Sequence, residues 1–79
     1  MYDVKIWRVN EDCKQFVANL VVKGYLCPCD GFQSVKANAM LNKLGKWDDI
    51  HPVLIHHSNL VELSEKDFKK LLDTYRSDI

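Results

Sequence analysis

Three cysteines are the residues of this chain best suited to chemistry. Cys13 stands alone, whereas Cys27 and Cys29 flank Pro28 and form the only close cysteine pair of the 79-residue sequence. Such a dithiol can cycle to a disulfide, and its small, strained ring makes that disulfide oxidising. An odd number of cysteines argues against a framework of structural disulfides. We therefore expect reduced thiols and a cytoplasmic location.

The three histidines offer another use for the cysteine pair. Cys27 and Cys29 could supply two zinc ligands, and His51, His56 or His57 could complete a tetrahedral site. Zinc-binding cysteines usually have two or more residues between them, and the sequence has no second pair. His56 and His57 are adjacent, so on a strand they point to opposite faces and cannot serve one site. We expect no bound metal.

Composition narrows the class of protein. Eleven basic and eleven acidic residues give a net charge of zero, which argues against a dedicated binder of nucleic acid or of a membrane surface. No apolar run approaches the ~20 residues that a membrane span needs, and the first residues lack the apolar stretch of a signal peptide. We therefore expect no nucleic-acid or membrane partner, and the sequence indicates no oligomeric state.

The cysteines are positioned by elements that the hydrophobic pattern predicts. Residues 2–9 alternate as in a strand. Asn10 is a suitable N-cap and Gly24 a suitable C′ residue, which favours a helix over residues 11–23. Residues 13–22 also alternate, and their valines favour a strand; we prefer the helix because of its start and stop signals.

The second half of the chain is predicted in the same way. A brief strand at 25–27 is followed by a helix at 34–44, with Gly45 as its stop. A polar connector then leads to a hairpin, in which strands at 53–55 and 60–63 are joined by a two-residue turn.

The last helix has the clearest signals. Ser64 is its N-cap, with Asp67 three residues on, and Leu63 and Phe68 have the spacing of a hydrophobic staple.

The resulting order is β-α-β-α-β-β-α. The stretches VKIWRVNEDCKQFVANLVVKGY at 4–25 and LNKLGKWDDIHPVLIHHSNLVEL at 41–63 resemble the glutaredoxin/thioredoxin-like family, in a form that lacks the usual Cys-x-x-Cys. The resemblance implies one thioredoxin-like α/β domain over residues 1–79. Its fold would be a four-stranded mixed sheet with helices on both faces.

The same resemblance assigns roles to residues. Asn10 and Cys13 occupy the two ends of the family's Cys-x-x-Cys, and the His51–Pro52 bond takes the place of its cis-proline. The implied catalytic residues are Cys13, Cys27 and Cys29. The implied substrate- or partner-binding residues are Asn10, Asp12, His51 and Pro52. We expect no cofactor, since the family's usual glutathione-binding residues are not evident.

Two functions follow as hypotheses. The first is a small glutaredoxin-like thiol–disulfide redox protein with atypical cysteines, whose oxidoreductase activity would be weak. The alternative is a catalytically degenerate member of the fold that binds and modulates a protein partner. Cys13 has a simpler interpretation as well, because free cysteine is often a small buried apolar residue.

Overall fold

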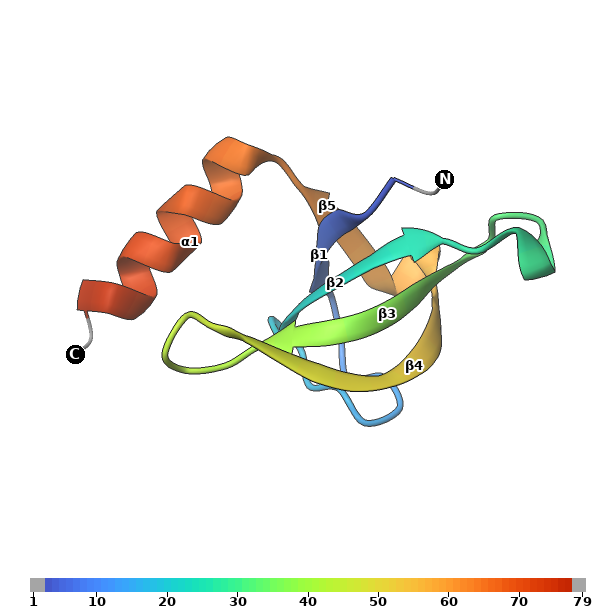
Figure 1. Ribbon diagram of the computed structural model, residues 1–79, viewed down its shortest axis with the longest axis horizontal. Coiled ribbons are helices and arrows are strands. Elements are labelled where there is room, and N and C mark those ends of the chain that lie inside the picture. Colours follow the sequence, from blue (N-terminus) through green and yellow to red (C-terminus); the bar gives the residue numbers. More distant parts are fainter. Residues whose placement is uncertain (1–2, 78–79) are drawn as a thin grey trace.

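Residues 3–77 form a five-stranded antiparallel sheet followed by one helix, as Figure 1 illustrates. The computed structural model describes the backbone of residues 3–77 and the side chains of residues 3–75. The strands are β1 (Lys5–Val9), β2 (Val21–Leu26), β3 (Ser34–Leu41), β4 (Trp47–His56) and β5 (Leu60–Leu63); the helix is α1 (Glu65–Ser77), and two 3-10 turns are η1 (Pro28–Asp30) and η2 (His57–Asn59).

The thioredoxin-like fold is wrong for this chain. The strand order is β4-β3-β2-β1-β5, and every pairing in it is antiparallel. The predicted β-α-β crossover is therefore absent from residues 3–77. The predicted hairpin at 53–63 is also wrong, because its two strands lie at opposite edges of the sheet and η2 joins them.

Residues 11–23 form a long loop and the start of β2 instead of a helix. Lys14 and Asn19 have φ angles of 54° and 71°, which no α-helix accommodates. Asp12 accepts the amide hydrogen of Ala18 at 2.9 Å, a local bond of the kind that competes with helix. Gly24 is not a helix stop: a Cβ there would lie 2.3 Å from the Lys36 carbonyl oxygen. The close approach of β2 and β3 requires glycine at this position.

The predicted helix at 34–44 is strand β3. Val35, Ala37, Ala39 and Leu41 are all buried, which is the period of two expected for a strand. Ala37 and Leu41 also fit a helical stripe, so the pattern was ambiguous. The segment is a strand because its backbone pairs with β2 on one side and with β4 on the other.

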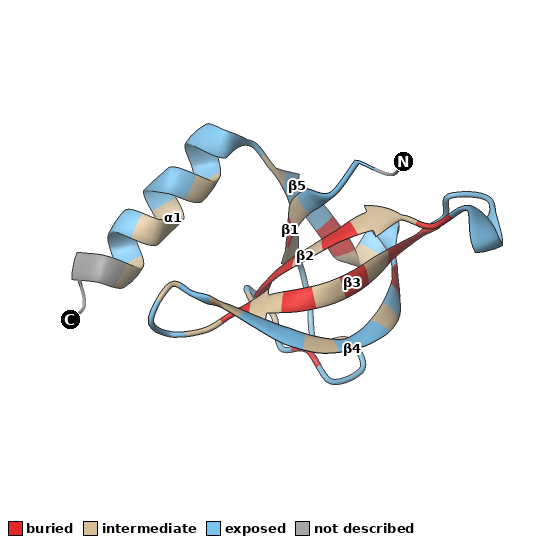
Figure 2. Cartoon of the chain, in the orientation of Figure 1, coloured by how far each residue is buried: buried red, intermediate tan, exposed pale blue. Residues whose placement is uncertain are grey.

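The main core lies inside the curl of the sheet. Its buried members come from every strand and from the β1–β2 loop; they are Trp7, Val9, Phe16, Val22, Val35, Ala37, Ile55 and Leu60. Buried residues gather in the strands, while residues 65–75 of α1 are all exposed or half-buried (Figure 2). The sheet therefore carries the stability, and α1 is an addition to it.

Helix α1 begins where the sequence predicts. The Ser64 hydroxyl accepts the backbone N–H of Asp67 at 3.2 Å, which is the predicted cap. The helix rests on the sheet through Phe68, whose ring stacks on Trp47 at a centroid distance of 5.7 Å. Lys23 places its Nζ 5.0 Å from the centroid of the same Trp47 ring. Among the described residues, no helix has the length and apolar character needed to cross a membrane.

Candidate functional site

Cys27 and Cys29 lie together in the β2–β3 loop. Cys27 follows β2 and is buried, whereas Cys29 is exposed in η1. A hydrogen bond to the Cys27 thiol raises the pKa of Cys29, and the Asp30 carboxylate adds to the effect. The thiolate is the reactive form of cysteine. A raised pKa therefore works against Cys29 as a nucleophile at neutral pH.

The loop around these cysteines is held by Asp30. Its Oδ1 accepts the backbone N–H groups of Gln33 and Ser34 at 3.1 and 3.3 Å. Hydrogen bonding with the Ser34 side chain, followed by these backbone bonds, holds the pKa of Asp30 below its usual range. Phe32, two residues after Asp30 in the same loop, is 55% exposed and has a φ angle of 64°.

Cys13, Asn10 and Asp12 lie in the β1–β2 loop, and each has a structural role there. Cys13 and Phe16 exchange two backbone hydrogen bonds at 2.9 Å, so this part of the loop is a tight turn. The Asn59 side chain donates to the Cys13 sulfur at 3.6 Å, and the Asn59 carbonyl accepts the Asn10 N–H at 2.8 Å. The two ends of the expected Cys-x-x-Cys position therefore bind η2 and do not sit at a helix N-terminus.

His51 and Pro52 are exposed residues of the edge strand β4. The expected cis bond between them is wrong, since the described chain contains no cis peptide bond. They lie where the register of β3 and β4 shifts between Ala37 and Ala39. A bulge in an edge strand is a place where proline is tolerated, and this gives Pro52 a structural reason.

The predicted site residues therefore occupy three separate parts of the fold: the β2–β3 loop, the β1–β2 loop and β4. His56 and His57 stack at 4.5 Å, and His56 Nδ1 lies 2.8 Å from the Ser58 hydroxyl. Within residues 3–75, no three His, Cys, Asp or Glu side chains come together as a metal site would require.

The feature that sequence reasoning missed is a groove between the sheet and α1. It is open to solvent, has a volume of about 610 Å³, and is lined by Val4, Lys5, Ile6, Glu62, Leu63, Ser64, Glu65, Phe68 and Lys69. Four of these residues are apolar, and the four charged ones are two lysines and two glutamates. Binding sites commonly combine a mainly apolar lining with a few polar groups.

Residues far apart in sequence build this groove. Ile6 pairs with Leu63 in the β1–β5 ladder, and Phe68 follows one turn into α1. The staple pattern singled out Leu63 and Phe68 but gave no sign of β1 as their neighbour. The Val4 side chain is 54% exposed at the groove.

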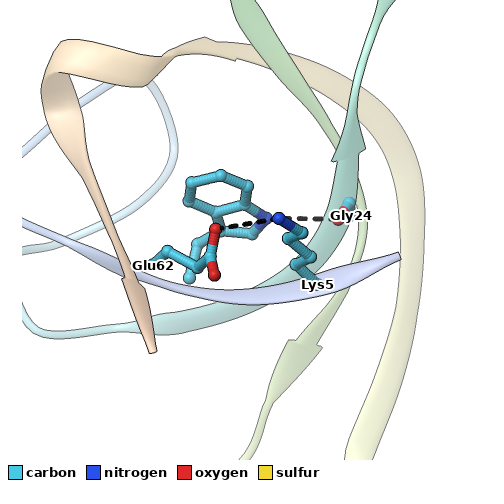
Figure 3. Close-up of polar contacts among 4 residues, drawn as sticks. Lys5, Gly24 and Glu62 are labelled. Atoms are coloured by element: carbon cyan, nitrogen blue, oxygen red, sulfur yellow. Dashed lines mark hydrogen bonds and ion pairs between the residues drawn. The ribbon is translucent and has the colours of Figure 1, made fainter. Parts of the chain in front are cut away.

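Lys5 and Glu62 form an ion pair beside the groove (Figure 3). Their side chains meet at 3.2 Å and are nearly half exposed. Such a pair contributes only about 0–1 kcal/mol to stability. Its larger effect is to neutralise both charges. The Trp7 indole N–H donates to the Gly24 carbonyl at 3.1 Å, which fixes the wall of the core.

In comparisons with known proteins, no family model, no curated protein and no solved structure matches the chain.

Proposed function

We propose that this chain is a non-catalytic protein-interaction domain that binds a partner through the groove between α1 and the β1–β5 edge. The observation that carries the proposal is the groove itself, with four apolar residues in its lining and a balanced set of charges. The partner is an uncharged, apolar segment of another protein, because a neutral lining gives no attraction to a highly charged one. With its cysteines reduced, the domain would act in the cytoplasm.

The half-buried state of α1 supports the same proposal. Its apolar residues Phe68, Leu71, Leu72 and Tyr75 repeat at helical spacing, yet none of them is fully buried. Amphipathic helices of globular domains normally bury such a stripe. A partner in the groove would cover Phe68, the member of this stripe that lines the groove.

Selection of peptides tests the proposal. A random library of linear dodecapeptides is displayed on phage and selected on the native protein. Binding of the selected peptides is then compared between two exposed-site variants, Val4→Lys and Leu44→Lys. Val4 lines the groove, whereas Leu44 is 66% exposed on the β3–β4 hairpin and does not line it.

We expect Val4→Lys to weaken binding at least tenfold and Leu44→Lys to leave it unchanged. Circular dichroism confirms that both variants are folded. If no selected peptide distinguishes Val4→Lys from the parent protein, the groove is not the binding site and the proposal is wrong.

Thiol–disulfide exchange at Cys27 and Cys29 is a second candidate, favoured by the position of both cysteines in one loop, with Cys29 exposed. In this reaction the Cys29 thiolate attacks a disulfide, and Cys27 resolves the mixed disulfide. The products are a 27–29 disulfide and a reduced dithiol. Glutathione disulfide should then remove two hydrogen atoms from the intact protein's mass, and Cys29→Ser should abolish this change. An unchanged mass or stable addition of glutathione would eliminate the candidate.

A further inference from the structure

The two edges of the sheet differ in how they could receive another strand. Only β4 and β5 have an edge without a neighbouring strand among the described residues. An open edge presents unpaired backbone N–H and C=O groups, and proteins usually obstruct such edges. The outward-facing groups of each strand can be deduced from the hydrogen bonds beside it, because these groups alternate along an antiparallel strand.

The β4 edge is obstructed in its middle, at Pro52 and Leu54. His57 donates its N–H to the Gln33 carbonyl at 3.0 Å, so Val53 and Ile55 face β3, and Pro52 and Leu54 face outward. Pro52 has no N–H to offer. The Leu54 carbonyl already accepts a hydrogen bond from Lys14 Nζ. The register shift beside Pro52 adds a further irregularity.

The β5 edge is open. The bond from the Asn10 N–H to the Asn59 carbonyl shows that Val61 and Leu63 face β1. Leu60 and Glu62 therefore face outward. The Leu60 N–H already donates a hydrogen bond to the His57 carbonyl. Three outward groups have no partner in the described chain: the Leu60 carbonyl and both backbone groups of Glu62.

These groups lie beside the groove. Glu62 and Leu63 belong to its lining, together with Ile6, which is paired with Leu63 across the ladder. A strand added next to β5 would thus place alternate side chains next to this lining. In such complexes the backbone bonds supply affinity, and the pockets for alternate side chains supply specificity.

We propose that the domain captures its partner by β-strand addition, with an extended, uncharged segment pairing with β5 and an aliphatic side chain entering the groove. This inference rests on the proposed function and names its mode of binding. Two lysines and two glutamates line the groove, and the ion pair with Lys5 neutralises Glu62. An uncharged segment therefore matches the electrostatics of the edge.

A second copy of this chain fits the edge less well. Antiparallel pairing of two β5 strands centred on Val61 would place Glu62 of each copy opposite Leu60 of the other. Each Glu62 N–H would then reach a Leu60 carbonyl, but each Leu60 N–H is already used internally. The Glu62 carbonyl of each copy would stay without a partner. A foreign extended segment satisfies all three groups.

The test compares Glu62→Pro with Glu62→Gln. Both variants lose the charge, but only proline removes the outward N–H, and proline is tolerated in an edge strand when its missing N–H faces solvent. The probe is an octapeptide that alternates valine with threonine, capped at both ends. Its binding is measured by NMR, from the changes in the backbone amide signals of the protein as the octapeptide is added. We expect Glu62→Pro to weaken binding at least tenfold and Glu62→Gln to change it less than threefold.

Other results would overturn the inference, and they separate it from the proposed function. Equal binding by both Glu62 variants, with loss in Val4→Lys, would reject strand addition and leave the groove as a binding site. A parent protein that does not bind the octapeptide would also reject strand addition, while the library selection judges the groove by itself. Self-association with slowed exchange of the Glu62 amide would identify a second copy as the occupant and reject a foreign segment. If Glu62→Pro does not fold, exchange of the Glu62 amide is measured in the parent protein with and without the octapeptide. Strand addition requires the octapeptide to slow this exchange, and an unchanged rate would reject it.

Discussion

Removing the Phe68 side chain should detach α1 from the sheet without unfolding the sheet. Phe68 stacks on Trp47 at 5.7 Å with an interplanar angle of 22°, and it also lines the groove. The main core contains no residue of α1. Phe68→Ala therefore changes the attachment of the helix and the groove lining but leaves the main core intact.

The expected loss can be worked out from two contributions. Full burial of a phenylalanine side chain is worth about 1.5–3 kcal/mol, so a half-buried one contributes about 1 kcal/mol. The aromatic pair adds about 0.5–1.5 kcal/mol. The docking of α1 should weaken by about 2 kcal/mol, which is about a 30-fold larger population of the detached helix. A detached helix of 13 residues is marginal in water and should fray.

Amide hydrogen exchange measures this directly. In Phe68→Ala, we expect faster exchange throughout α1 and unchanged exchange in β2 and β3, with a partial loss of ellipticity at the helical minimum. Lys70→Ala is the matched control, because Lys70 is exposed on the same helix and should leave exchange unchanged. If Phe68→Ala leaves the exchange of α1 as slow as in the parent protein, Phe68 does not anchor the helix and the description of the groove wall is wrong.

Three further predictions concern the sheet and its loops. Gly24→Ala should cost about 3 kcal/mol or more in urea unfolding, because the new Cβ would lie 2.3 Å from the Lys36 carbonyl oxygen; an unchanged or increased stability, as Gly→Ala gives inside a helix, would contradict the β2–β3 register. The lowered pKa of Asp30 means that its contribution to stability is present above about pH 4 and is lost as the pH falls through the lower folded-state pKa. Urea midpoints measured from neutral to acidic pH should therefore fall less in Asp30→Asn than in the parent protein, and parallel curves would exclude this role. Lys5→Ala should cost less than about 1 kcal/mol, and added salt should remove that difference; a larger cost that persists in salt would show a role beyond the exposed ion pair.

Local signals in the sequence predicted part of this fold. The cap of α1 at Ser64 is confirmed, as is a first strand, although the Tyr2 end of that strand lies outside the described residues. The segments 53–55 and 60–63 are extended within β4 and β5. All of these depend on a few neighbouring residues, which is the range over which propensity and capping act.

The failures share a physical cause, which is that sheet pairing is non-local. Gly24 looked like a helix stop because its real constraint, the Lys36 carbonyl, comes from another strand. Ala37 and Leu41 fit two periods, and only the neighbours β2 and β4 decide between them. The thioredoxin-like resemblance rested on the same local patterns.

The groove was missed for the same reason. The cysteines drew attention because of their chemical type, but the groove is built by residues such as Lys5 and Glu62, which are 57 positions apart in sequence. No spacing within one segment could indicate that pairing. The open edge of β5 depends in turn on which residues face β1.

The open edge of β5 can be tested by the exchange rate of the Glu62 amide in the free, dilute protein. This N–H faces outward without a partner in the described chain, so it should exchange at nearly the rate of an unstructured peptide. Val61 and Leu63 face β1 and should exchange at least about tenfold more slowly. A Glu62 amide as protected as those of Val61 and Leu63 would mean that the β5 edge is closed, and it would contradict both the open edge and the strand addition inferred from it.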